Sequence, residues 1–348
     1  MADHLSVLQP GLLVTVQDRG RYGYQEFGVP VAGAIDQIGL RLANALVGNP
    51  AGEGCLEICY LGPTLRVEAL SVRLAVYGQV DIVLTEDNGL RRPIESNRTH
   101  LLKQGDVIAI GAVSDSSVAY MAVAGGFALE PFMGSVSTYL RGHLGPLSGS
   151  ALRAGMVLAL REGDAEDKGE VAFSKPWRYG EGPIRVILGP QDDCFTEESI
   201  SAFLAGDYSV TKEADRMGMR LAGPQLHHRL RADIASDALV SGSIQVPGNG
   251  QPIILLADHQ TTGGYAKIAT VISADLSRVG RSLPESTLRF RAVTVEEAEA
   301  ARRAQEEAIR SCMDAIADVN KAKVTRLEDR LWSSNLVSGT VDALGDVF

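Results

Sequence analysis

Short apolar runs recur along most of the chain, and Gly, Pro, Asn or Asp residues stand at their ends. Examples are TLRVEAL, SVRLAVYG, VDIVLTEDNG, DVIAIGAV, VAYMAVAGG, MVLALREG, IRVILGP and PIILLAD. Apolar runs of this length that end in turn residues are typical of β-strands, and so many of them favour a barrel or a sandwich. The pair Asn88-Gly89 indicates a hairpin turn. The sequence therefore predicts a mainly β protein with a few helices.

Three segments have the periodicity of helices, at residues 36–47, 196–205 and 294–331. The first starts near Asp36 and stops at Gly48, and the second is capped by Thr196. Thr294 and Glu297 form a capping box at the start of the third. The third segment keeps an apolar stripe made of Ile309, Met313, Ile316, Leu327 and Leu331. We expect this last helix to dock on the protein or to face a partner, with a loose tail from Ser333.

A charged, glycine-bearing segment, REGDAEDKGEVAFSKPWRYGEGP, divides the chain and ends at Gly182-Pro183. Its composition is that of a linker, so it predicts a boundary between two β-rich units near residue 175. The expected organisation is one β-barrel domain at 1–175, a second at 176–293, and a C-terminal helix and tail at 294–348.

Composition, charge and the cysteine pattern argue against several classes of function. The chain has 348 residues, 45% of them hydrophobic, and a formal net charge of −10, which argues against a nucleic-acid or anionic-membrane surface. Cys55 and Cys59 are too few for a zinc site, and no other pattern suggests a metal. The N-terminus resembles no signal peptide, and no apolar run is long enough to span a membrane. We therefore expect a cytoplasmic protein without a metal.

Standard nucleotide-loop and hydrolase motifs are missing, but five polar clusters follow one another along the chain. They read VQDRGRYGYQEFGVPVAGAID, GSVSTYLRGHLG, LGPQDDCFTEE, EADRMGMRLAGP and GSIQVPGNGQPIILLADHQTTGGYAKIATVISADL. In this order they resemble the allophanate hydrolase subunit 2, or carboxyltransferase-C, family, over residues 12 to 300. The resemblance implies two cyclophilin-like β-barrels, in agreement with the two β-rich units that the strand pattern predicts.

The resemblance also implies an activity, the ATP-dependent cleavage of 5-oxo-L-proline to L-glutamate by a complex of subunits. The partners would be subunit-A-like and subunit-B-like proteins, the latter of the allophanate hydrolase subunit 1 type, and ATP would be used by the complex. One alternative is a biotin-dependent carboxyltransferase component that acts on a urea-like or other small amide. The chain has no Met-Lys-Met sequence, so another protein would supply the biotin. A second alternative is a regulator that binds a subunit-1-like kinase inhibitor.

The segment DHQTTGGYAKIA, residues 258–269, is the strongest candidate for the site. Gly263 and Gly264 can bend the backbone so that successive N–H groups form an anion-binding nest. The segment adds hydroxyl groups and a cation through Thr261, Thr262, Tyr265 and Lys267. Such a set suits a carbonyl oxygen that gains negative charge during reaction. The alternative is a β-hairpin that needs glycine for its turn.

Asp258, at the start of this segment, would act as a base or orient Lys267, unless it only caps a turn. Gln245 could hydrogen-bond a lactam or ureide ring through both its donor and its acceptor, or satisfy a strand edge. Asp215 and Arg216 form either a local ion pair or an anion clamp in which Arg216 holds a carboxylate. His259 is expected to be exposed.

Two polar clusters in the first unit are weaker candidates for the site than the residues between 245 and 267. The first comprises Asp18, Arg19 and Arg21, which could bind an anion or tie a loop by bonds to the backbone. The second comprises Ser137, Thr138, Tyr139 and Arg141.

Overall fold

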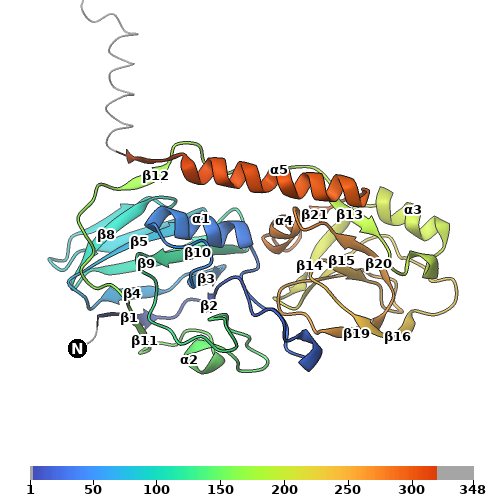
Figure 1. Cartoon of the computed structure of the whole chain (residues 1–348), viewed down its shortest axis with the longest axis horizontal. Helices are drawn as coiled ribbons and strands as arrows, with labels where there is room; N and C mark the ends of the chain where they lie inside the picture. Colours follow the sequence, from blue (N-terminus) through green and yellow to red (C-terminus); the bar gives the residue numbers. More distant parts are fainter. Residues whose placement is uncertain (1–2, 320–348) are drawn as a thin grey trace, which may run out of the picture.

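The computed structural model describes residues 3–319, and β-strands dominate it (Figure 1). The strands up to residue 173 are β1 (His4–Gln9), β2 (Leu13–Gln17), β3 (Cys55–Cys59), β4 (Thr64–Val67), β5 (Ser71–Tyr77), β6 (Val80–Thr85), β7 (Arg91–Ile94), β8 (Thr99–Lys103), β9 (Val107–Val113), β10 (Val118–Val123), β11 (Val157–Ala159) and β12 (Val171–Phe173). Those that follow are β13 (Ile184–Leu188), β14 (Tyr208–Ala214), β15 (Gly218–Ala222), β16 (Asp233–Ala238), β17 (Ser243–Gln245), β18 (Ile253–Leu255), β19 (Thr262–Tyr265), β20 (Lys267–Val271), β21 (Thr287–Leu288), β22 (Phe290–Ala292) and β23 (Ile316–Asp318). The helices are α1 (Gln37–Val47), α2 (Pro146–Gly149), α3 (Glu197–Ala205), α4 (Leu276–Gly280) and α5 (Val295–Asp314), with short 3-10 turns η1 (Gln25–Phe27) and η2 (Asp192–Cys194).

The first unit consists of two antiparallel sheets that enclose one core. One sheet has the order β11-β1-β4-β9-β6-β7 and the other the order β2-β3-β10-β5-β8. Strand β5 is buried at every position because its two faces meet different partners. Val72 and Leu74 pack into the core between the sheets, whereas Ala75 and Tyr77 belong to a cluster with α1. This period of two explains why the run SVRLAVY is buried on both faces.

The second unit is built on one eight-stranded sheet, in the order β21-β14-β15-β18-β17-β20-β13-β22. Its core includes Val186, Phe203, Ile244 and Ile268, and it is separate from the core of the first unit. A two-stranded ribbon, β16 with β19, lies apart from this sheet. The mainly β fold with a few helices is confirmed, and the turn at Asn88-Gly89 joins β6 to β7 with a φ of 85° at Gly89.

The starts of the three predicted helices are confirmed by their caps. Asp36 accepts hydrogen bonds from the N–H groups of Ile38 and Gly39 at the start of α1. Thr196 accepts one from Ser199 at the start of α3. Thr294 forms the predicted capping box at the start of α5. Each cap satisfies N–H groups that lack a partner within the helix.

The end of the last helix was predicted wrongly. Helix α5 ends at Asp314 instead of continuing to 331, and Ile316 lies in β23, which pairs with β12 through the register Phe173↔Ile316. The hydrogen bonds of this strand pair compete with further helical turns, and a helical pattern in the sequence does not reveal them. Leu327, Leu331 and the predicted tail from Ser333 lie outside the described residues.

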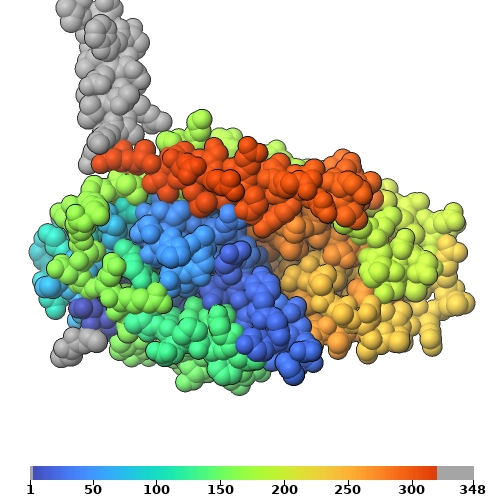
Figure 2. Space-filling model, viewed as in Figure 1, coloured from blue at the N-terminus to red at the C-terminus, as the bar shows by residue number. Residues whose placement is uncertain are grey.

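Helix α5 runs along both units (Figures 1 and 2). Glu306 of α5 accepts two hydrogen bonds from Arg41 of α1, at 2.9 and 2.8 Å, and Gln305 donates to the carbonyl of Ala274 in the second unit at 2.6 Å. The segment between the units also packs here, since Trp177 and Tyr179 contact the cluster beneath α1 and α5. Within residues 3–319, no helix is long and apolar enough to cross a membrane.

Candidate functional site between the two units

Arg216 lies in the turn between β14 and β15 and points into the boundary between the units. The preceding residue, Asp215, shapes this turn by accepting hydrogen bonds from the N–H groups of Met217 and Gly218, at 2.8 and 3.1 Å. An aspartate that bonds the backbone two and three residues ahead is a standard turn former. Asp215 is therefore not the ion-pair partner of Arg216, and the prediction of a local pair was wrong.

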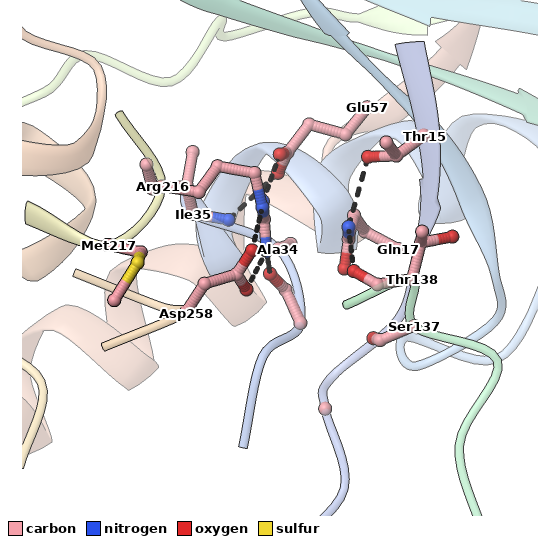
Figure 3. Close-up of polar contacts among 12 residues, drawn as sticks. Thr15, Gln17, Ala34, Ile35, Glu57, Ser137, Thr138, Arg216, Met217 and Asp258 are labelled. Carbon is pink, nitrogen blue, oxygen red and sulfur yellow. Dashed lines mark hydrogen bonds and ion pairs between the residues drawn. The ribbon is translucent and has the colours of Figure 1, made fainter. Parts of the chain in front are cut away.

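Two carboxylates hold the Arg216 guanidinium instead (Figure 3). Its Nε and Nη2 atoms donate to Asp258 Oδ2 and Oδ1, at 2.9 and 2.8 Å, and its Nη1 donates to Glu57 of the first unit. The side chains of all three residues are at most 6% exposed. The Arg216 guanidinium, predicted to bind a substrate carboxylate, thus already binds two carboxylates of the protein. Asp258 is also engaged here and does not orient Lys267.

Burial and charge act against each other in this cluster. Burial alone lowers the pKa of the Arg216 guanidinium, but the carboxylates of Asp258 and Glu57 outweigh it and hold that pKa well above its usual value. Glu57 also accepts hydrogen bonds from the Tyr120 hydroxyl at 2.6 Å and from the Ile35 N–H at 2.8 Å. These hydrogen bonds partly compensate the cost of burying the negative charge of Glu57. The cluster thereby ties the two units together.

Next to this cluster, several buried polar atoms have no hydrogen-bond partner within the described residues. They are Gln17 Oε1, Thr138 Oγ1, and the Nε and Nη1 atoms of Arg21. Gln17 donates its Nε2 hydrogens to Thr15 Oγ1 and to the Thr138 carbonyl, both at 3.0 Å (Figure 3). Arg21 donates from Nη2 to the Ser137 carbonyl at 2.5 Å. A buried polar group without a hydrogen-bond partner destabilises the fold by about 1–3 kcal/mol, so the region around these atoms is suited to a small polar ligand.

Asp18, in contrast, is fully engaged in tying its own loop. It accepts hydrogen bonds from the Ser135 hydroxyl at 2.7 Å, the Val136 N–H at 2.8 Å and the Gly20 N–H at 2.7 Å. For Asp18 itself, these contacts favour the interpretation in which its side chain fixes a loop.

An open cleft of about 520 Å³ lies beside the Arg216 turn and joins the two units. It is lined by Arg141 from the first unit and by Lys212, Glu213, Ala214, Asp215, Met217, Gly218, Arg220, Gln245, Ile253, Leu255, Gln260 and Tyr265 from the second. The structure therefore brings together three residues that the sequence analysis selected in the second unit, Asp215, Gln245 and Tyr265. It adds Arg141 from a cluster that had ranked lower.

Gln245 is the buried polar group of this cleft. Its Nε2 donates to the Tyr265 carbonyl at 3.3 Å, and no other hydrogen bond of its amide is found in residues 3–319. A Cβ atom placed on Gly263 would lie 2.7 Å from Gln245 Nε2. Glycine at 263 therefore makes room for this amide, a role different from the one predicted for it.

The backbone nest at Gly263 and Gly264 was predicted wrongly. Both residues lie in strand β19, in register with β16 through Asp237↔Gly263, and neither has a positive φ. A pairing strand straightens the backbone, so successive N–H groups point to opposite sides and cannot converge on one anion. Thr261 and Thr262 are also absent from the lining of the cleft.

Lys267 and His259 are both buried, and neither lines this cleft. The Lys267 ammonium, 3% exposed, contacts Asp237 Oδ2 at 2.6 Å and the Ala238 carbonyl at 3.1 Å. It lies on β20, beyond Ala266, and does not line the cleft. A catalytic role for Lys267 stays a prediction. His259, expected to be exposed, is 3% exposed, and burial lowers the pKa of its imidazole.

Glu57 and Tyr120 were not among the residues predicted from the sequence. Glu57 stands in the middle of CLEIC, and Tyr120 in the apolar run VAYMAVAGG. A carboxylate inside a buried strand must have a charged or hydrogen-bonding partner, so the position of Glu57 was the signal. Burial, together with the Glu57 charge, raises the pKa of the neighbouring Cys59 thiol to about 12, which leaves it unreactive. Within residues 3–319, no group of His, Cys, Asp and Glu side chains could hold a metal ion.

The chain is thus a protein of two β-units that meet across a polar boundary. Comparison with known proteins shows the family to which it belongs. The model of the carboxyltransferase domain, subdomain A and B, matches residues 27–292. The chain belongs to this carboxyltransferase domain family. The C subunit of the 5-oxoprolinase of Escherichia coli (strain K12) is 34% identical over 306 residues, which cover 87% of this chain and 95% of that protein.

Two further relatives show how the family varies. The C subunit of the Haemophilus influenzae 5-oxoprolinase is 32% identical over 303 residues, 87% of this chain and 95% of that protein. The crystal structure of the Kluyveromyces lactis urea carboxylase superposes with a TM-score of 0.79 at 29% identity, over 88% of this chain. The chain corresponds to only 29% of that longer protein. The family therefore occurs both as a separate subunit and as part of a larger enzyme.

Proposed function

We propose that this chain is the lactam-binding subunit of an ATP-dependent 5-oxoprolinase complex, which cleaves 5-oxo-L-proline to L-glutamate. The observation that carries the proposal is the cleft in which Arg141 and the Gln245 amide lie on one surface. Arg141 forms no ion pair within residues 3–319. The similarity to the C subunits of two 5-oxoprolinases supports the same reaction.

The chemistry of the cleft matches the two polar ends of the substrate. 5-Oxoproline carries a carboxylate and, across a small ring, a lactam N–H and carbonyl. A guanidinium such as that of Arg141 binds a carboxylate through two parallel hydrogen bonds. The Gln245 amide offers both a donor and an acceptor, the complement of a lactam edge. A donor at the lactam oxygen gains strength as charge develops there during activation by ATP.

The cleft supplies binding groups but no serine or cysteine nucleophile. Its described lining contains no Ser, Cys or His, and the sequence has no Walker A loop. We therefore infer that turnover needs partner proteins of the subunit-A and subunit-B types. The isolated chain should show little or no ATP-dependent cleavage of 5-oxoproline, and robust turnover by the chain alone would overturn this requirement.

The test compares variants of the cleft in the assembled complex by steady-state kinetics with 5-oxoproline. Arg141→Met should raise KM about tenfold or more, because a charge-assisted hydrogen bond contributes about 1.5–3 kcal/mol. Gln245→Ala should lower kcat/KM by a similar factor. Arg153→Met is the control, since Arg153 is exposed and does not line the cleft. An Arg141→Met enzyme with unchanged KM would remove this cleft from the reaction.

The similarity to urea carboxylase favours a second candidate, a biotin-dependent carboxyltransferase component for a small amide. A biotin-carrying partner would bring the carboxyl group, and Gln245 would bind the acceptor amide through the same hydrogen bonds. The two candidates differ in one measurement. Release of glutamate from 5-oxoproline without added biotin carrier supports the first, and carrier-dependent carboxylation of urea supports the second.

A further inference from the structure

A second pocket, of about 380 Å³, lies where the loop before α1, α1 itself, the second unit and α5 meet. In Figure 2, the dark-blue loop and the blue helix α1 lie beside the orange part of the second unit, beneath the red α5. The polar residues that line the pocket include Arg19, Tyr22, Gln25, Gln37, Arg41 and Arg302. Its volume is in the range of small-molecule sites.

The charge of this pocket is opposite to that of the chain. The chain has a formal net charge of −10, yet three arginines and no acidic residue are among the described lining residues. Glu306, behind them, is shared between Arg41 at 2.8 Å and Arg302 at 2.6 Å. Arg41, followed by Arg302 and Arg19, lowers the pKa of the Glu306 carboxyl. Three guanidinium groups against one carboxylate leave an excess of positive charge.

Arg19 is the cation with no ion pair in this part of the described chain. The aliphatic part of its side chain lies against Gly52, where a Cβ atom would be only 2.8 Å from Arg19 Cδ. Glycine at 52 therefore leaves the space that the aliphatic part of Arg19 occupies. Arg19 is exposed and remains available to an anion that enters the pocket, and Arg41 of α1 and Arg302 of α5 line the same pocket.

We propose that this pocket binds a nucleoside triphosphate, with its phosphates on Arg19, Arg41 and Arg302 and its base against the ring of Tyr22. The inference rests on the proposed function, which requires ATP. Guanidinium groups match phosphate oxygens with paired hydrogen bonds, and a site of this kind needs no glycine-rich loop. Tyr22 is 67% exposed at the pocket, and an exposed aromatic face stacks readily on a base. Gln25 and Gln37 add amides that can bond the base edge or the ribose.

The experiment is a calorimetric titration of the full chain, alone and with its partner subunits, using Mg-ATP, tripolyphosphate and adenosine in turn. ATP and tripolyphosphate should bind, with ATP the tighter. Arg19→Met and Arg302→Met should each weaken both ligands about tenfold or more, as expected for a lost charge-assisted contact. Tyr22→Ser should weaken ATP and leave tripolyphosphate unchanged.

Arg303→Met is the matched control, since Arg303 is the next residue on α5, pairs with Glu299 at 3.3 Å and does not line the pocket. It should leave both affinities unchanged. Thermal midpoints of all variants separate lost binding from lost folding.

The proposal is overturned if the chain binds no ATP in either form, or if Arg303→Met weakens ATP as much as Arg19→Met does. It is also overturned if Tyr22→Ser leaves the affinity for ATP unchanged, because the pocket would then be a site for polyphosphate and not for a nucleotide. Failure of the proposed function looks different. In that case ATP would bind with the predicted dependence on Arg19, while no complex that contains the chain would cleave 5-oxoproline.

Discussion

The buried cluster of Arg216, Asp258 and Glu57 makes a quantitative prediction about the boundary between the units. Arg216→Met keeps most of the side-chain volume but removes the positive charge between two carboxylates that are at most 6% exposed. Removing one partner of a buried ion pair costs about 3–5 kcal/mol, because the remaining charge is left without compensation. For a protein of this size about 2–4 °C is lost per kcal/mol, so the thermal midpoint should fall by about 6 °C or more.

Urea denaturation followed by circular dichroism, together with thermal scans, measures this loss. Arg289→Met is the control, since its pair with Asp207 is more than half exposed on both sides and exposed pairs contribute about 0–1 kcal/mol. Adding Glu57→Gln to Arg216→Met should recover part of the stability, since it removes one of the two stranded charges. Glu57→Gln in the otherwise unchanged protein should instead destabilise it. A loss below about 1 kcal/mol for Arg216→Met would refute the reasoning, because a buried pair that ties the units cannot be removed so cheaply.

Three further changes test other parts of the site. Gly263→Ala should raise KM for the lactam, because the added methyl group would lie 2.7 Å from Gln245 Nε2. Gly264→Ala is the control and should leave KM unchanged, since the nearest atom to a methyl group there is 3.6 Å away. Equal kinetics for the two variants would contradict this packing. Lys267→Ala should lower the thermal midpoint, because the buried ammonium loses its ion pair with the half-exposed Asp237. A fall of about 10²–10³ in kcat would establish the catalytic role predicted from the sequence. Burial lowers the pKa of His259, so the unfolded chain binds more protons, and the free energy of unfolding should fall as pH drops below about 6.5, the unfolded value. His259→Gln should flatten this pH dependence, and an unchanged slope would show that His259 does not cause it.

The sequence by itself determined the features that depend on neighbouring residues. Strand runs, the turn at Asn88-Gly89 and the caps at Asp36, Thr196 and Thr294 are set by local hydrogen bonding and by side-chain alternation. A mainly β fold with helices at the predicted starts follows from these patterns alone. The order of the polar clusters was also sufficient to indicate the family.

The tertiary structure decided how distant residues pair. Arg216 meets Glu57 across 159 positions and Asp258 across 42, whereas the sequence suggested only a pair with its neighbour Asp215 or a clamp on a substrate carboxylate. Gly263 is extended because β16 pairs with β19, and α5 stops because β23 pairs with β12. In each case a contact between remote segments overrides the conformation or pairing that neighbouring residues favour. No pattern of adjacent residues records such a contact, so only the folded chain places Arg141 in one cleft with Gln245 and Arg19 in one pocket with α5.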